Sequence, residues 1–110
     1  MIASSEFIRG YSEILVLSIL CIRDSYVYDL VQTLNEITNG QIVITNPSML
    51  FVVRKLQDEG KVTSYEKAND RGVFRKYYKI TEYGLNYYYT FKQEYINSLE
   101  SMKKIIVGNF

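Results

Sequence analysis

The chain has 110 residues, 47% of them hydrophobic, which is enough for one domain with an apolar core and too few for two. Its net charge is only +1, but residues 61–80 hold six cations and two anions, whereas residues 1–40 hold two cations and five anions. A basic excess confined to one short segment favours a local contact with phosphates. With one cysteine and no histidine, the chain can form neither an intrachain disulfide nor a Cys/His zinc site.

The first predicted element is a helix over residues 6–22. It is apolar nearly all round from Ile14 to Ile22, so it belongs in the centre of the domain. This run of nine residues is much shorter than the roughly 20 that a membrane span needs. The charged residues before it fit a secretion signal poorly, and we therefore expect a cytosolic protein without a membrane partner. Cys21, inside the run, is interpreted as a small core residue.

Two further helices are predicted with the order of a helix-turn-helix. From Tyr26 to about Asn39 the apolar residues recur at helical spacing, and Asn39-Gly40 ends the pattern. Asn46-Pro47 marks the start of a third helix, with Asn46 as its N-cap, that runs to about Glu59. In such a pair the second helix enters the major groove, and its N-terminal residues contact base edges.

The third helix has one face for the core and one for a partner. Met49 or Leu50, Val53 and Leu56 form the predicted core stripe. Its opposite stripe, together with the first residue, supplies the candidates for DNA contact in the major groove: Asn46, Ser48, Phe51, Arg54 and Lys55. The two cations can reach phosphates or a guanine edge, and Ser48 can donate to a phosphate near the helix N-terminus. Phe51 offers no hydrogen bond, so it fits a thymine methyl group or a partner protein.

A β-hairpin is predicted next, with strands over residues 61–67 and 74–80 and a polar tip over 68–73. Its candidates for contact with the DNA backbone or minor groove are Lys67, Arg71, Arg75 and Lys76. Because side chains alternate along a strand, Phe74, Tyr78 and Ile80 share a face and are expected to pack on the domain. The alternative is a solvated basic hairpin without a ligand.

The last predicted helix opens at Thr81-Glu82 and lasts to about Val107. Apolar and aromatic residues recur at heptad spacing, and a helix of this length extends about 39 Å, more than a small domain covers alone. We therefore expect a homodimer whose interface contains Leu85, Tyr88, Tyr89, Tyr95, Ile96, Leu99, Met102 and Ile106. The alternative is that this helix folds back over the first one. Tyrosines 87–89 and 95 suit interface packing or a cavity for a planar aromatic ligand.

Together these elements predict a mainly α fold with a small β-hairpin. The order is that of a winged helix-turn-helix domain over residues 1–80 with a C-terminal dimerisation helix over 81–110. There is no G-x-S-x-G sequence, no phosphate-binding glycine loop and no cluster of catalytic residue types. Neither an enzyme nor a bound metal or cofactor is therefore expected.

Several segments resemble the PadR family of bacterial transcriptional regulators over about residues 6–90. The most specific is Arg75–Gly84, RKYYKITEYG, and it is supported in order and spacing by Arg9–Leu17, Ser25–Leu30, Arg54–Gly60 and Arg71-Gly72. The resemblance implies a homodimeric repressor that binds a roughly palindromic duplex operator and, in several relatives, is released by a small aromatic molecule. By position, its reading helix corresponds to residues 47–59 and its wing to about 67–75. This chain has Tyr26-Val27-Tyr28 where the family usually has Tyr-Gly-Tyr.

The sequence thus predicts a dimeric, sequence-specific DNA-binding regulator of transcription, most simply a repressor. Two other functions would use the same scaffold. One is a protein-interaction module such as an antirepressor, with Phe51 and the apolar cluster Met49–Val53 as its contact surface. The other is a DNA-binding protein that marks a plasmid or phage partition site.

Overall fold

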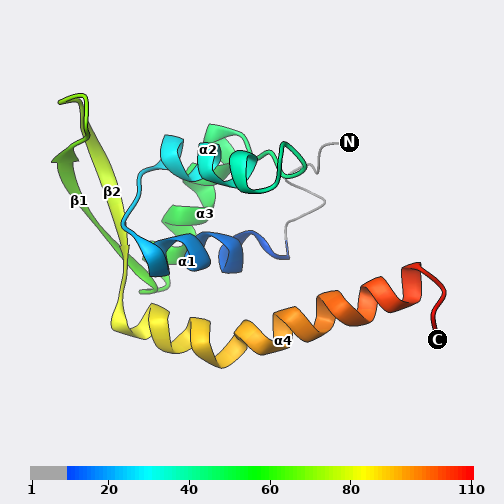
Figure 1. Cartoon of the computed structure of the whole chain (residues 1–110). Helices are drawn as coiled ribbons and strands as arrows, with labels where there is room; N and C mark the ends of the chain where they lie inside the picture. Colours follow the sequence, from blue (N-terminus) through cyan, green and yellow to red (C-terminus); the bar gives the residue numbers. More distant parts are fainter. Residues whose placement is uncertain (1–9) are drawn as a thin grey trace.

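The computed structural model describes residues 10–110. Its elements are α1 (Ser12–Ile22), α2 (Val27–Ile37), α3 (Asn46–Asp58), β1 (Val62–Ala68), β2 (Phe74–Ile80) and α4 (Glu82–Ile106). Figure 1 shows the first three helices gathered into one body, from which the hairpin projects on one side, while α4 runs along the body and past it. The predicted fold class, mainly helical with a small antiparallel hairpin, is confirmed. The division into domains at residue 80 stays a prediction.

Helix α1 lies at the centre of the core, as its apolar sequence predicted. Five of its side chains are buried among residues of α2, α3, β2 and α4: Ile14, Val16, Leu17, Ile19 and Leu20. Cys21 is half-buried against this core. The helix begins later than predicted, because Gly10 and Tyr11 form a turn and Ser12 is the first helical residue. The predicted start at residues 6–9 lies outside the described residues.

The start of α3 differs from the prediction by one residue. Thr45, and not Asn46, is the N-cap, and its Oγ1 accepts a hydrogen bond from the backbone N–H of Ser48 at 3.3 Å. Asn46 is the first helical residue, followed by Pro47, which has no N–H to leave unpaired. Thr is a good N-cap as well as Asn, and here the hydroxyl of Thr45 reaches the third helical N–H.

The hairpin pairs seven residues of each strand, from Val62 opposite Ile80 to Ala68 opposite Phe74. Strand β2 is also joined to the segment before α2 by two backbone hydrogen bonds between Ser25 and Tyr78, of 2.7 and 3.1 Å. This second attachment fixes the base of the hairpin to the helical body, where Tyr78 is 1% exposed.

One expectation for the hairpin is wrong. Phe74 does not pack on the domain but is 74% exposed, because the strands extend beyond the helical body at that end. Tyr77, which alternation placed on the other face, is 9% exposed. Its ring stacks on Tyr65 with centroids 5.7 Å apart and meets the edge of Tyr26 at 5.2 Å. Both faces of β2 are therefore covered near its base.

The first half of α4 packs on α1, and the second half is exposed. Tyr88 belongs to the core, and the ring of Tyr95 lies 5.7 Å from that of Tyr11. The helix begins at a Thr81 cap whose hydroxyl accepts from the N–H of Gly84 at 3.0 Å. Over residues 10–110, no helix combines the length and the apolar character needed to cross a bilayer.

Candidate nucleic-acid interface

The four hairpin cations that were predicted to contact DNA are exposed: Lys67, Arg71, Arg75 and Lys76. Two of them lie against the aromatic stack at the base of the hairpin. The ammonium of Lys67 is 5.1 Å from the centroid of the Tyr77 ring, and the guanidinium carbon of Arg75 is 5.7 Å from that of Tyr26. Contacts of this kind hold the charged group over one face of a ring, and both residues remain exposed to solvent. The hairpin therefore presents positive charge from a fixed base.

The N-terminal half of α3 lies beside these cations. Asn46 and Leu50 line a groove of about 280 Å³ together with Arg75 and Lys76 of β2. Phe51, 70% exposed, and Arg54 point outward from the same helix. Ser48 is half-buried, and its hydroxyl accepts a hydrogen bond from Thr45 Oγ1 at 3.0 Å, so it serves the helix cap. The structure thus brings together the start of α3 and the wing, as a helix-turn-helix interface requires.

Lys55 is placed differently from Arg54. Its ammonium is 2.7 Å from Glu13 Oε2 of α1 and 3.9 Å from Glu59 Oε2. The hydrogen bond to Glu13 and the negative charge of that carboxylate raise the pKa of Lys55. No ion pair holds Arg54 in the described part of the chain. Of the two cations predicted to reach DNA from α3, Arg54 is therefore the one that is free to do so.

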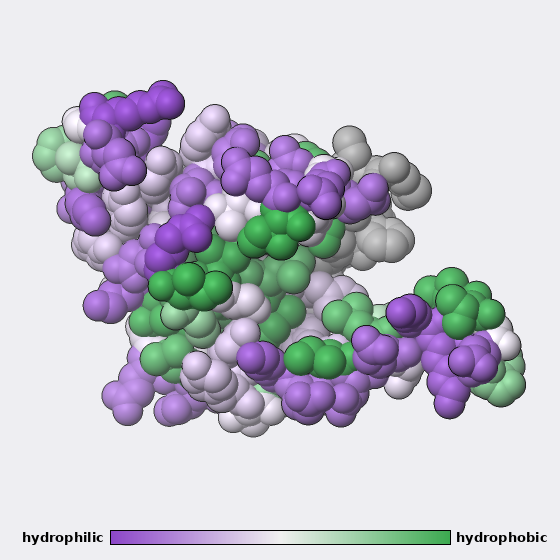
Figure 2. All heavy atoms as spheres, in the orientation of Figure 1, coloured by the Kyte–Doolittle hydropathy of each residue, from purple (hydrophilic) through white to green (hydrophobic). Residues whose placement is uncertain are grey.

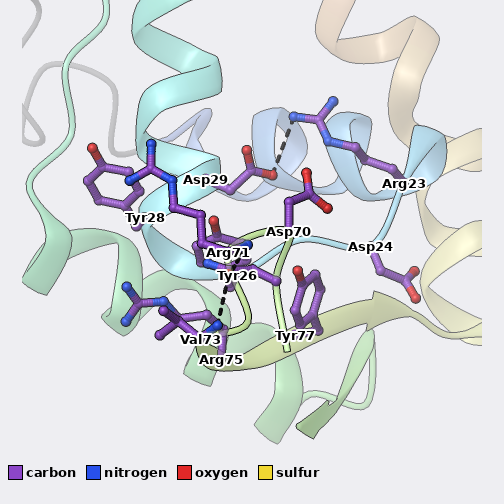
Figure 3. Close-up of a pocket in the computed structure, with 11 residues that line it drawn as sticks. Arg23, Asp24, Tyr26, Tyr28, Asp29, Asp70, Arg71, Val73, Arg75 and Tyr77 are labelled. Carbon is purple, nitrogen blue, oxygen red and sulfur yellow. Dashed lines mark hydrogen bonds and ion pairs between the residues drawn. The ribbon is translucent and has the colours of Figure 1, made fainter. Parts of the chain in front are cut away.

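A second, larger cleft separates the hairpin tip from the start of α2, and sequence reasoning did not single it out (Figure 3). Its volume is about 470 Å³, and Tyr28, 54% exposed, lines both this cleft and the groove beside α3. Tyr28 is therefore a candidate for phosphate contact. The sequence did contain an indication of this residue, since Tyr26-Val27-Tyr28 lies at the position of the family's Tyr-Gly-Tyr motif.

Carboxylates also line this cleft, and two of them accept hydrogen bonds from nearby side chains. Asp24 accepts a hydrogen bond from the Tyr65 hydroxyl at 2.5 Å. This bond, with burial and the negative charge of Asp24, raises the pKa of Tyr65 to about 12. Asp29 accepts from the Ser25 hydroxyl and lies 3.4 Å from the guanidinium of Arg23. These bonds reduce the repulsion that free carboxylates would exert on phosphates.

The residues predicted for a dimer interface fall into two groups. Tyr88 is buried in the core of its own chain, and Leu85 and Tyr95 are half-buried. The others are exposed on α4: Tyr89, Ile96, Leu99, Met102 and Ile106. The predicted heptad seam is thus covered by the helical body at Leu85, Tyr88 and Tyr95 and exposed at the remaining residues. We call the five exposed residues the outer α4 strip.

The fold and this surface define a class of protein, the winged helix-turn-helix proteins that bind DNA. The model of the transcriptional regulator PadR-like family matches residues 16–89, and the chain belongs to this family of DNA-binding regulators. The sequence resemblance is thereby confirmed. No set of three or more metal-binding side chains is grouped in the part of the chain that the structure describes.

Solved structures of transcriptional regulators agree with this assignment, and one uncharacterized curated protein is also similar in sequence. A transcriptional regulator from Clostridium thermocellum is similar with a TM-score of 0.77 and 29% identity, over 91% of this chain and 94% of that one. A PadR-like transcriptional regulator from Bacillus cereus has a TM-score of 0.78 and 26% identity, over 93% and 97%. An uncharacterized protein from Lysinibacillus sphaericus is 28% identical over 102 residues, which are 93% of this chain and 90% of that protein.

Proposed function

We propose that this transcriptional regulator is a homodimeric repressor that acts in the cytoplasm on a roughly palindromic operator. The observation that carries the proposal is the groove in which Asn46 and Leu50 of α3 meet Arg75 and Lys76 of the wing. Base-edge contacts from Arg54 and Asn46 would supply specificity, and the wing cations would hold phosphates. A gel shift with the DNA just upstream of the protein's own coding region tests binding directly.

The salt dependence of binding tests the role of the wing. Each phosphate that a cation neutralises steepens the slope of log K against log salt by about 0.9. Replacing Arg75 and Lys76 by Ala removes two cations from each chain, so in a dimer the slope should flatten by about 3 to 4. The matched control is Lys103→Ala with Lys104→Ala, an equal charge change in the last turn of α4. A slope like that of the parent for the wing variant would show that the wing does not contact phosphates.

The outer α4 strip supports the proposed dimer. It gathers apolar side chains that are 38 to 82% exposed on α4, and such a strip is typical of a subunit interface. Leu99→Glu should convert the dimer to a monomer in light scattering. Ser101→Glu, on roughly the opposite side of the helix, should not. A monomeric parent protein would contradict the proposal.

A cavity between α4 and the turn before α1 supports release of DNA by a small aromatic molecule. It measures about 310 Å³ and is lined by Tyr11 of that turn and by Tyr87, Phe91, Glu94 and Tyr95 of α4. That volume lies at the lower end of the range for small-molecule sites. The planar fluorophore 4-methylumbelliferone is a suitable probe. We expect it to displace operator DNA from the parent and not from Phe91→Ala, and equal displacement would place the site elsewhere.

The exposure of Phe51 supports one alternative, an antirepressor that binds another protein through α3. Phe51 is 70% exposed on the outward face of that helix, beside the half-buried Leu50. Under this alternative, the protein shifts no DNA but retains a partner in a pull-down, and Phe51→Ala releases that partner. Under the proposed function, Phe51→Ala weakens DNA binding instead, because a contact with a thymine methyl group is lost.

A further inference from the structure

The outer end of the wing carries two exposed apolar side chains. Phe74 is 74% exposed, and the adjacent Val73 is 44% exposed. Figure 2 shows the hairpin at the upper left as a mostly hydrophilic surface that carries a few apolar atoms at its outer edge. Phe74 and Val73 are adjacent in the sequence, so they form a small apolar patch at the end of the wing that a partner can contact.

The tip is held in one conformation by its own hydrogen bonds. The side-chain oxygen of Asn69 accepts from the backbone N–H groups of Arg71 and Val73, both at 3.0 Å. The backbone N–H of Asn69 donates to the carbonyl of Val73 at 2.8 Å, and Gly72 supplies the positive φ of 76° that closes the turn. Phe74 therefore projects from a rigid support and needs little ordering when it meets a partner.

Phe74 shares a face of β2 with Lys76 and Tyr78. Both of these residues line the groove that Asn46 and Leu50 of α3 also line. Three carboxylates lie instead in the cleft toward α2: Asp24, Asp29 and Asp70. One carboxylate, that of Glu66, lies on the same face of the hairpin as Phe74, and Glu66 is paired across the strands with Lys76.

The charge around Phe74 favours a polyanion as its partner. Residues 66–76 contain four cations and two anions, so the tip has a net positive charge. An apolar side chain flanked by cations is the arrangement with which proteins enter the minor groove, where the cations hold phosphates on either side and the apolar group parts two base pairs. A protein partner would find the same apolar group surrounded by uncompensated charge.

We infer that Phe74 is a wedge that enters the minor groove beside each half-site and partly unstacks one base step. This inference rests on the proposed DNA binding. It adds a specificity that hydrogen bonds do not supply, because pyrimidine–purine steps such as TA and CA/TG unstack more easily than others. The operator then carries a flexible step where each wing contacts it, and the protein bends its DNA.

Operators selected from random duplexes provide the test, with bending measured by energy transfer between dyes at the duplex ends. The parent protein should bend the selected duplex, and the selected sites should contain a flexible step at the position of each wing. Phe74→Ala should reduce the bend and weaken binding about tenfold. Its salt slope should not change, since no charge is removed. Phe74→Leu should keep most of the bend, because leucine is also found as a wedge.

A change of DNA sequence separates the wedge from any indirect effect of the substitution. Replacing the flexible step at the wing by a stiff AA step should weaken the parent about tenfold and Phe74→Ala hardly at all. Ile37→Ala, also at a strongly exposed apolar residue but in α2, is the matched control and should behave like the parent. If Phe74→Ala bends DNA and discriminates between the steps as the parent does, the proposal that Phe74 is a wedge is wrong. The proposed repressor function would not be affected by that result. If the parent binds no duplex, both proposals fail.

Discussion

The first turn of α4 leaves no room for a side chain at Gly84. A Cβ at that position would lie 2.1 Å from the carbonyl oxygen of Lys61 and 2.8 Å from Cγ1 of Ile80. The oxygen is fixed in place, since it accepts a hydrogen bond from the backbone N–H of Thr81 at 3.0 Å. Ordinary contact begins near 3.4 Å. Gly84→Ala must therefore push the start of α4 away from Lys61 by more than an ångström.

Two opposing effects set the size of the loss. Alanine is the better helix former by about 1 kcal/mol, which favours the variant. Overpacking typically costs about 1–3 kcal/mol, and the cost here lies at the upper end or above it because the obstacle is backbone. The displaced helix also loosens the packing of Tyr88, which is 8% exposed in the core. We expect a net loss of about 2 kcal/mol in the free energy of unfolding, or about 10 °C in Tm.

Thermal unfolding followed by far-UV circular dichroism measures this change, at equal protein concentrations because dimerisation would itself raise Tm. Gly10→Ala is the matched control, since a Cβ there meets no atom within 4 Å, and its Tm should stay close to that of the parent. An unchanged or higher Tm for Gly84→Ala would refute the reasoning. It would mean that the first turn of α4 does not pack against the residue that precedes β1.

Three other substitutions test separate parts of the structure. The hydrogen bond to Asp24 raises the pKa of Tyr65 to about 12, so its stabilising effect is complete below the unfolded value of about 10 and is lost as the pH rises through the folded pKa. Tyr65→Phe should therefore reduce the alkaline loss of stability in urea unfolding, and an unchanged alkaline profile would contradict the assigned bond. Arg54→Ala should weaken operator binding about tenfold in a gel shift. Lys55→Ala should weaken operator binding far less, because the ammonium of Lys55 is paired with Glu13 of α1. Equal losses of affinity for the two variants would indicate that both cations contact DNA. Thr45→Ala should lower the free energy of unfolding by about 1 kcal/mol, because the N-cap of α3 is lost. An unchanged urea midpoint would indicate that Asn46 is the N-cap instead.

The elements were predictable because their signals are local. Apolar residues at helical spacing marked α2, alternation marked the strands, and Asn39-Gly40 and Gly60 marked the ends of helices. Each signal acts within a few residues and does not depend on where the rest of the chain goes. Even the N-cap error at α3 was a choice between adjacent residues, Thr45 and Asn46, that both favour that position.

The features that the sequence did not predict depend on tertiary position. Alternation correctly assigned Phe74 and Tyr77 to opposite faces of β2, but it does not say where along the strand the helical body ends. Phe74 lies beyond that edge, whereas Tyr77 is covered by Tyr26, a residue from another part of the chain. Lys55 likewise pairs with Glu13, which is 42 positions away in sequence. No periodicity within either segment reports such a contact.

The reading helix, the wing and α4 meet at Lys61, whose side chain is only 10% exposed. Its ammonium lies 3.1 Å from Glu59 at the end of α3, 3.9 Å from Glu13 of α1 and 3.7 Å from the centroid of the Tyr87 ring of α4. Burial alone would lower the pKa of Lys61, but the hydrogen bond to Glu59 and the nearby charges raise it, so the group stays charged. The backbone carbonyl of the same residue accepts from Thr81, where α4 begins. Reading helix, wing and α4 are thus held in one rigid arrangement. In the proposed dimer, the spacing of the half-sites would therefore be set by how two copies of α4 pair, and no hinge within the chain has to be ordered on binding.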